Sequence, residues 1–368
     1  MDTQNISQCP EVSVKCFLLS MFHSISNRQD ACSTKADCGI GILPVLENGA
    51  VFPLNRAKNS ARVLYVSPIA LKLAKTWQQT PQAIAAQLAE TLEPLCCPNF
   101  AVKVAPTGII EFELTDACLG FWLQRLAQTK LAIPESRILS AVVNADRLFP
   151  IQYSHARCCS LLRMAHRDRL ISIAQPDVAT APQIWSLTAP NPIPWLDKGD
   201  RLRLIHPAEC NLISQLITVL DNLAPILGNC TQNNIVGTRH CRLLHHSGAT
   251  GIDINTQNNI VGTRHCRLLH HSGATGIDIN TQNNIVGTRH CRLLYHSGAT
   301  GIDINYLKLA NNLSAAFQTF YSQCRIWGEV KIQTPKLAQA RLGLVLATQS
   351  LLRFILEELL SAVAPLEL

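Results

Sequence analysis

The sequence contains no two cysteines at the C-x-x-C spacing of zinc-binding or thioredoxin-like sites. Its fifteen cysteines are the adjacent pairs Cys96-Cys97 and Cys158-Cys159 together with single residues, and their number is odd. These spacings disfavour a disulfide framework and a metal site. They indicate free, largely buried thiols in a reducing cytosol, and we expect neither a metal ion nor another cofactor.

Long apolar runs and nucleotide-binding loops are also missing. The run from Val14 to Phe22 follows an acid, has no basic segment before it and is too short to span a bilayer. Gly39-x-Gly41 is a lone fragment without a third glycine, and no Gly-Lys-Ser/Thr occurs. We therefore expect a cytoplasmic protein without membrane contact.

Charge is sparse. Hydrophobic residues make up 47% of the 368 residues and charged residues 15%, which is typical of a soluble globular protein with room for two domains. Three of the seven net positive charges lie in tandem repeats, so the rest of the chain is only mildly basic. The exception is residues 147–169, with five arginines and a single acid, Asp168. Charge concentrated in this way favours RNA binding.

This basic segment has helical periodicity. Pro150 suits the first helical position, and apolar residues recur at helical spacing after it. Tyr153, Arg157 and Ser160 form a neighbouring stripe, with Arg163 and Arg167 one turn apart on the polar side. On charge alone, an amphipathic core helix with a solvated basic face is the favoured interpretation. The predicted buried stripe is Ile151, Cys158, Leu162 and Ala165.

Before this helix, residues 1–60 lack a clear pattern and predict a loosely ordered extension or a small strand pair. Residues 62–130 predict an α+β domain. A helix follows Ser67-Pro68 as far as Trp77, and a second follows the cap at Thr80. Two alternating runs around Thr107-Gly108 predict a hairpin, and a helix follows from Asp116.

Residues 148–230 and 306–368 predict an all-α helical bundle, because three further amphipathic helices follow the basic one. One follows His206-Pro207, one starts near Tyr306 and the last begins near Lys336. We expect residues 170–205, rich in Pro and Trp, to be a loop within this bundle. The fold class is thus an α+β domain followed by a helical bundle that carries an insertion.

The insertion, residues 231–305, consists of three copies of a 25-residue sequence that differ only at His245, His270 and Tyr295. The period fits a small β-solenoid. Near-identity, however, indicates a recent duplication placed where a loop is tolerated, and we favour a disordered or weakly β loop. The spacing of His240, Cys241, His245 and His246 matches no metal-ligand pattern.

Several motifs resemble parts of arginyl-tRNA synthetases. Gln152-Tyr153-x-His155-Ala156-Arg157-x-x-Ser160 resembles the opening helix of the DALR anticodon-binding domain, the C-terminal helical domain of that family. Later helices are similar as well. Their matching stretches are Leu309-Ala310…Phe317-x-x-Phe320-Tyr321-x-x-Cys324, Ala340-Arg341-Leu342-x-Leu344-Val345-x-Ala347-Thr348 and Ala364-Pro365-x-x-Leu368, with Leu368 for the usual Met.

Residues 62–130 resemble the N-terminal domain of the same family, which contacts the outer corner of the tRNA. The family usually has Pro, Phe and Asn where this chain has Thr107, Ile109 and Glu111. An acid facing RNA opposes phosphate binding, so the fold is implied more firmly than the contacts. The matching residues are Ala70, Leu71, Leu73, Ala74, Lys75, Pro81, Ile84, Ala85, Ala105, Gly108, Ile110 and Phe112.

In that family a catalytic domain of several hundred residues lies between the two modules, and residues 131–147 leave no room for it. His-Ile-Gly-His and Lys-Met-Ser-Lys motifs are absent, and Met1, Met21 and Met164 are the only methionines. The sequence therefore predicts a non-catalytic tRNA-binding protein that does not bind DNA, with arginine tRNA as one candidate partner. Two alternatives stay open: a module that acts on a synthetase in trans, and an arginine–tRNA ligase whose catalytic domain comes from a partner.

The resemblance and the residue chemistry together nominate seven RNA-binding residues. Tyr153 is suited to stack on an unpaired base, and Gln152 and His155 to contact base edges. The arginines are suited to phosphate or base contacts, although helix–helix packing explains Tyr153 and Arg341 equally well. The four arginines are Arg157, Arg163, Arg167 and Arg341.

Overall fold

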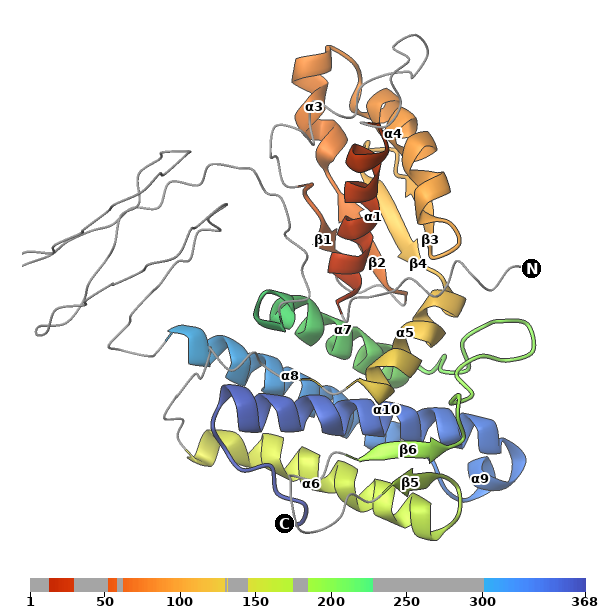
Figure 1. The fold of residues 1–368 in the computed structure, drawn as a ribbon, viewed down its shortest axis with the longest axis vertical. Helices are drawn as coiled ribbons and strands as arrows, with labels where there is room; N and C mark the ends of the chain where they lie inside the picture. Colours follow the sequence, from red (N-terminus) through yellow and green to blue (C-terminus); the bar gives the residue numbers. More distant parts are fainter. Residues whose placement is uncertain are drawn as a thin grey trace, which may run out of the picture. The chain divides into compact units, whose positions relative to one another are not determined.

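A computed structural model describes residues 13–29, 52–57, 62–129, 131, 145–174, 185–227 and 301–368 (Figure 1). By its contacts the chain divides into a unit of Met1–Gln232 with Asp303–Leu368 and a unit of Asn233–Ile302. Residues 231–300, which make up most of the three repeats, lie outside the described residues. The predictions of a loop or a solenoid there therefore stay predictions. The helix α8 (Gly301–Gln323) begins within the third copy.

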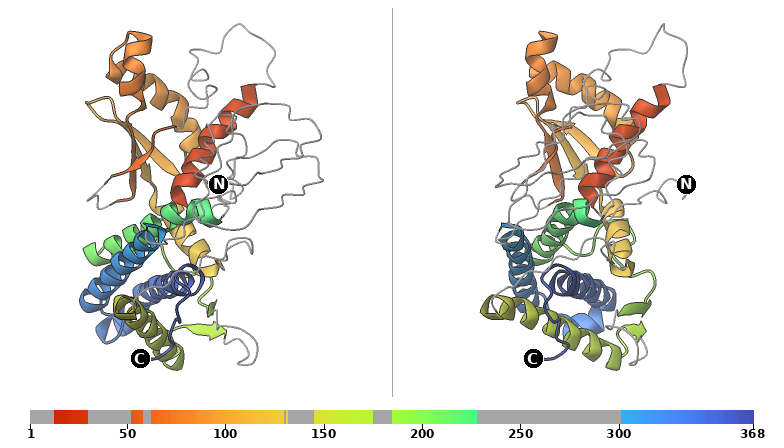
Figure 2. Two further views of the ribbon diagram at one scale, coloured as in Figure 1. Left: turned by 90° about the vertical axis from the view of Figure 1, so that its left-hand side faces the viewer. Right: turned by 60° about the vertical axis from the view of Figure 1, so that its left-hand side comes forward.

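The first part of the chain folds around an antiparallel sheet of order β1-β2-β4-β3. Its strands are β1 (Asn55–Arg56), β2 (Leu64–Ser67), β3 (Phe100–Val104) and β4 (Ile110–Leu114). In β4 the side chains alternate between buried and half-buried, as expected for a strand with one face against a core. Three helices pack beside the sheet: α1 (Val14–Gln29), α3 (Ile69–Trp77) and α4 (Pro81–Cys96) (Figure 2).

The predictions for residues 62–130 agree with these elements. Thr80 caps α4 by accepting a hydrogen bond from the Ala83 amide at 3.3 Å. Gly108 lies in the predicted turn with φ +80°, and a Cβ there would lie 2.7 Å from the Cβ of Pro81. The final helix, α5 (Asp116–Gln128), is capped by Thr115, whose hydroxyl accepts from the Cys118 amide.

The prediction for residues 1–60 is wrong where the structure describes them. Residues 13–29 contain α1, and β1 adds an edge strand to the sheet. The rings of Phe17 and Phe22 on α1 contact Phe100 and Phe112 on the strands. The helix escaped prediction because its apolar residues form a dense run without regular spacing.

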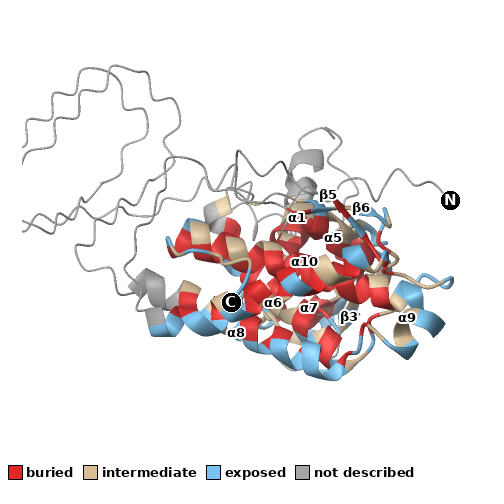
Figure 3. Ribbon diagram, turned by 90° about the horizontal axis from the view of Figure 1, so that it is seen from below, coloured by how far each residue is buried: buried red, intermediate tan, exposed pale blue. Residues whose placement is uncertain are grey.

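The second part of the chain is helical, with α10 (Pro335–Phe354) at its centre (Figure 3). α10 packs against α5, α6 (Ala145–Arg167) and α7 (Pro207–Leu227), and from Ala340 to Gln349 every residue is buried. A helix buried on all sides is expected to be apolar all round. A π-helical turn, η2 (Ile355–Leu359), follows, and a short helix, α9 (Glu329–Gln333), precedes α10.

Two predictions for this part are corrected. α6 begins at Ala145, so Pro150 lies inside the helix and not at its first position. Residues 170–205 are not simply a loop. They form the hairpin of β5 (Ser172–Ala174) and β6 (Ser186–Ala189), and the side chains of Trp185, Ile193 and Trp195 are buried. The indole nitrogen of Trp195 donates to Gln124 Oε1 on α5 at 3.0 Å.

Candidate nucleic-acid interface

α6 presents one buried face and one exposed face. Its predicted buried stripe, from Ile151 to Ala165, has no measurable exposure. On the opposite face Phe149 and Tyr153 are 58% and 46% exposed, and Ser160 is exposed as well. Burial on the first face fixes the rotation of the helix. The aromatic residues are therefore held at the surface by the packing of their neighbours.

The exposed aromatic rings lie beside an arginine. The rings of Phe149 and Tyr153 are nearly parallel, with centroids 6.3 Å apart and an interplanar angle of 29°. The guanidinium of Arg157 lies 4.7 Å from the ring centroid of Tyr321 on α8 and also donates to its hydroxyl. We call these four residues, Phe149, Tyr153, Arg157 and Tyr321, the aromatic–arginine surface.

Phe149, Tyr153 and Arg157 lie on α6, and Tyr321 lies on α8. Hydrogen bonds between these two helices hold the surface together. The hydroxyl groups of Ser154 and Ser314 are 2.5 Å apart in a buried contact. Ser314 also donates to the Pro150 carbonyl at 2.9 Å, and Gln318 donates to Ser154 at 3.2 Å. The order of these contacts shows that α6 and α8 run in the same direction. Replacing either serine with an apolar residue would remove one of the hydrogen-bond partners of the other serine's hydroxyl.

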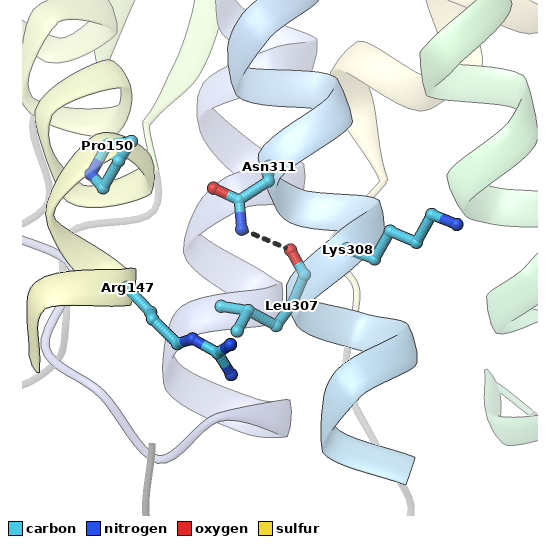
Figure 4. A pocket seen from close by; sticks show the side chains of 5 residues that line it. All are labelled: Arg147, Pro150, Leu307, Lys308 and Asn311. Carbon is cyan, nitrogen blue, oxygen red and sulfur yellow. Dashed lines mark hydrogen bonds between the residues drawn. The ribbon is translucent and has the colours of Figure 1, made fainter. Parts of the chain in front are cut away.

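Where α6 and α8 begin, they border a pocket of about 430 Å³. The described residues of its lining include the cations Arg147 and Lys308 and no carboxylate (Figure 4). The guanidinium of Arg147 points toward Leu307, whereas Lys308 extends away from it (Figure 4). Asn311 uses its amide group to donate to the Leu307 carbonyl at 2.9 Å. The pocket thus adds positive charge to this end of the helix pair.

Three predicted RNA-binding residues instead fasten the last residues of the chain across α6. Gln152 donates to the Val363 carbonyl at 2.9 Å. Nδ1 of His155 lies 2.8 Å from the Pro365 carbonyl. Arg163 donates to the Leu366 carbonyl and forms an ion pair with Glu367, each at 2.9 Å. A side chain engaged in this way has less capacity left for an RNA contact.

His155 corrects the prediction most clearly, because its side chain is fully buried. Nε2 lies 3.0 Å from the amide nitrogen of Gln349, and Nδ1 is used by Pro365. Loss of solvent contact lowers the pKa of His155, so the neutral ring is favoured. A buried ring with both nitrogens occupied does not contact a base edge.

Arg341 is also not at the surface. It is 8% exposed, and Nε lies 2.6 Å from Oε1 of the buried Glu209 on α7. Its guanidinium donates to the Arg325 carbonyl too. This arginine therefore joins α10 to α7, which is the packing alternative considered for it. Removing one partner of such a pair leaves a buried charge without compensation.

Arg167 is exposed, but the structure does not place it beside Tyr153. Fourteen residues separate them on α6, which at 1.5 Å per residue is about 21 Å along the axis. Arg163 lies on the side of α6 that contacts the last residues of the chain. Its guanidinium carbon is 5.9 Å from the centroid of the Trp185 ring. Of the seven predicted residues, only Tyr153 and Arg157 belong to the aromatic–arginine surface.

The sequence predictions missed two residues of this surface as site residues. Phe149 is one helical turn before Tyr153, a spacing that places the two rings on one face. Tyr321 lies in one of the stretches that resemble the synthetase family, but its neighbour Arg157 comes from a distant helix. The i, i+4 spacing would have identified Phe149, whereas no local signal identifies Tyr321.

The described residues do not contain a group of three or more His, Cys, Asp or Glu able to hold a metal ion. None of the described helices combines the length and apolar character needed to cross a bilayer. Cys16 is disulfide-bonded, which differs from the free thiols expected. Among the described residues, the free cysteines are Cys96, Cys97, Cys118, Cys158, Cys159, Cys210 and Cys324.

Residues 44–114 match the family model described as the arginyl tRNA synthetase N terminal domain. The match covers the four-stranded sheet with α3 and α4, and it supports a relation between this chain and arginyl-tRNA synthetases. No curated protein and no solved structure matches the chain. The match ends before α5 and so does not include the aromatic–arginine surface.

Proposed function

We propose that this protein binds tRNA through the aromatic–arginine surface and does not aminoacylate it. The observation that carries the proposal is the exposure of Phe149 and Tyr153 next to the Arg157–Tyr321 pair. Unpaired bases stack on exposed aromatic rings and guanidinium planes, and the positive charge attracts the backbone. A tRNA anticodon loop offers such bases.

Two further observations support tRNA as the RNA. The matched N-terminal domain relates the chain to enzymes that act on tRNA. The helices α6, α8 and α10 also carry the motifs that resemble the DALR anticodon-binding domain. In the structure many of these motif residues, such as Leu344 and Phe320, are buried. They therefore support the fold of the bundle, while the exposed Tyr153 and Tyr321 support the contact.

We propose no aminoacylation by this chain alone, because the link between the sheet domain and the helical bundle is short. α5 ends at Gln128 and α6 begins at Ala145. A segment of that length is far too short for a nucleotide-binding domain. An arginine–tRNA ligase activity would need a partner that supplies the catalytic domain.

Binding of purified protein to total tRNA at several salt concentrations tests the proposal. We expect Tyr153→Ala to weaken binding by about 1–3 kcal/mol, the usual loss of one base–aromatic stack. Tyr153→Phe should bind nearly as well, because it keeps the ring. Sequencing the bound RNA would show whether arginine tRNAs are enriched.

The matched control is Ile205→Ala, which removes an exposed apolar side chain that lies outside the aromatic–arginine surface. Its affinity should equal that of the unchanged protein. Equal affinity of Tyr153→Ala and the unchanged protein would contradict the proposal. In that case the second candidate is docking on a synthetase in trans, and the exposed Ile205 and Ile332, at 80% and 81%, are the first positions at which to test it.

A further inference from the structure

The segment that follows η2 lies beside α6 and is neither helix nor strand (Figure 1). We call this segment, residues 361–368, the latch. Its first residue, Ser361, has φ +48°, so the chain changes direction there as it leaves η2. The side chains of Val363 and Leu368 are exposed, and Leu366 is only partly buried against the core. A segment with so little burial opens at a lower cost than the helices beneath it.

Side chains of α6 bind the latch mainly through its main-chain carbonyls. Gln152 and Arg163 hold it at the surface, and Arg163 also pairs with Glu367, which is 78% exposed. A surface ion pair of this kind contributes little to stability. The remaining contact is different, because it joins the Pro365 carbonyl to the fully buried ring of His155.

The contacts of the His155 ring fix where its proton lies. A carbonyl only accepts hydrogen bonds, so the contact with Pro365 requires the proton on Nδ1. Nε2 is then the acceptor for the side-chain amide of Gln349. A second proton on Nε2 would face that N–H group. Turning the Gln349 amide round would restore a hydrogen bond but would leave a positive charge in a buried site.

Ionisable groups from four elements surround this histidine. The Cys159 sulfur on α6 is 3.9 Å from both ring nitrogens, and burial raises the pKa of this thiol to about 12, which keeps it neutral. Arg353 on α10 disfavours a charged ring and Glu357 on η2 favours it, but these two side chains also pair with each other at 2.7 Å. The latch contributes Glu367, in its ion pair at the surface. Burial is therefore the main influence, and it lowers the pKa of His155.

Of the two groups that bind the ring, Pro365 is the easier to displace. Gln349 belongs to the part of α10 in which every residue is buried, so moving it would unpack the centre of the bundle. We infer that the latch is an acid-sensitive switch: it closes over the neutral ring of His155, moves away when the ring takes up a proton, and uncovers Gln152 and Arg163. In the open form the ring reaches water, where its pKa returns to the ordinary 6.5. Acid therefore favours the open form, and no RNA is required.

Hydroxyl-radical footprinting of the full chain tests the inference, because radicals oxidise side chains according to their exposure. From about pH 7.5 to about pH 5, oxidation of Cys159 should rise about threefold or more, as the ring of His155 no longer covers it. Leu366 should follow. Cys158 is the internal control, because it lies in the buried stripe of the same helix and should change only if α6 unfolds. The exposed Leu368 corrects for the reagent.

Variants separate the ring from the surface contacts. His155→Gln removes the titrating group and should abolish the increase in acid. Arg163→Gln weakens the closed form but keeps the ring, so opening should begin at higher pH, with its midpoint moved toward 6.5. Arg167→Gln removes the same charge from an exposed position on α6 and should keep the midpoint of the unchanged protein.

Four outcomes would overturn the inference. Equal oxidation of Cys159 at both pH values would show that acid does not open the latch, and an equal rise at Cys158 would show unfolding of α6 instead. An unchanged midpoint in Arg163→Gln would show that the latch is not coupled to the ring. A response that persists in His155→Gln but disappears in Glu367→Gln would assign the titration to the surface ion pair.

Discussion

Tyr153 and His155 are two residues apart on α6 and have opposite environments. The ring of Tyr153 is half exposed, whereas the ring of His155 is enclosed by Gln349, Cys159 and the Pro365 carbonyl. The rotation between neighbouring helical positions is enough to cause this difference. At this scale, the environment of a side chain decides whether it is available to a partner or holds the fold together.

His155 should make the stability of the protein depend on pH. Burial lowers its pKa below the ordinary 6.5, so the unfolded state takes up the proton first as pH falls. Its contribution is fully present above pH 6.5 and is lost as pH falls from there toward the lowered pKa. The free energy of unfolding, measured by denaturant titration, should decrease over that window.

The variant His155→Gln should flatten this part of the pH profile. His166→Gln, which changes an exposed histidine on the same helix, should keep the decrease. An identical pH profile for His155→Gln and the unchanged protein would assign the dependence to another group.

At the scale of elements, the non-helical segment of residues 185–206 packs against the helices α5 and α10. Trp195 lies so close to Gly343 on α10 that a Cβ there would be 2.4 Å from its Cη2 atom. A glycine inside a long helix normally lowers stability relative to alanine. Here it makes room for an indole ring.

Gly343→Ala should therefore destabilise the protein, against the usual helix preference. Overpacking of this size costs about 1–3 kcal/mol. Gly120→Ala on α5 is a matched control, because its Cβ would meet the flexible end of Leu196 at 3.0 Å. Its effect on the free energy of unfolding should be smaller. If Gly343→Ala is neutral or stabilising, Trp195 moves more easily than the packing indicates.

At the scale of the whole described unit, Asp221 on α7 joins the helices to the sheet domain. Its carboxylate accepts from the Tyr65 hydroxyl at 2.6 Å, the Ser13 hydroxyl at 2.8 Å and the Lys15 amide at 3.1 Å. Arg56 on β1 adds a 2.7 Å hydrogen bond to the Ser214 carbonyl of α7. These bonds connect α1 and two strands to one helix.

Asp221→Ala should lower the free energy of unfolding by several kcal/mol, since each buried donor left without an acceptor costs about 1–3 kcal/mol. Asp221→Asn should cost less because it keeps one acceptor oxygen. Burial raises the pKa of Asp221, so the neutral amide also avoids the cost of a buried charge. Unfolding in urea would measure both. Similar stability for Asp221→Ala and the unchanged protein would show that the two parts are stable independently.

The sequence by itself determined the elements whose signals are local. Caps, turn residues and apolar spacing predicted α3, α4, α5 and the β3–β4 hairpin. The same spacing identified the buried stripes of α6 and α7. These features depend on residues within one or two helical turns of one another, which is the range that periodicity and capping describe.

The tertiary structure alone decided which polar residues are available. Arg341 is paired with Glu209, more than a hundred residues away in the chain, and the last residues of the chain engage Gln152, His155 and Arg163. It also brought Tyr321 beside Arg157 and α1 against the sheet. Such contacts join distant segments, and their energies depend on burial and on the partner found there. A polar side chain in a sequence does not show which partner it will have.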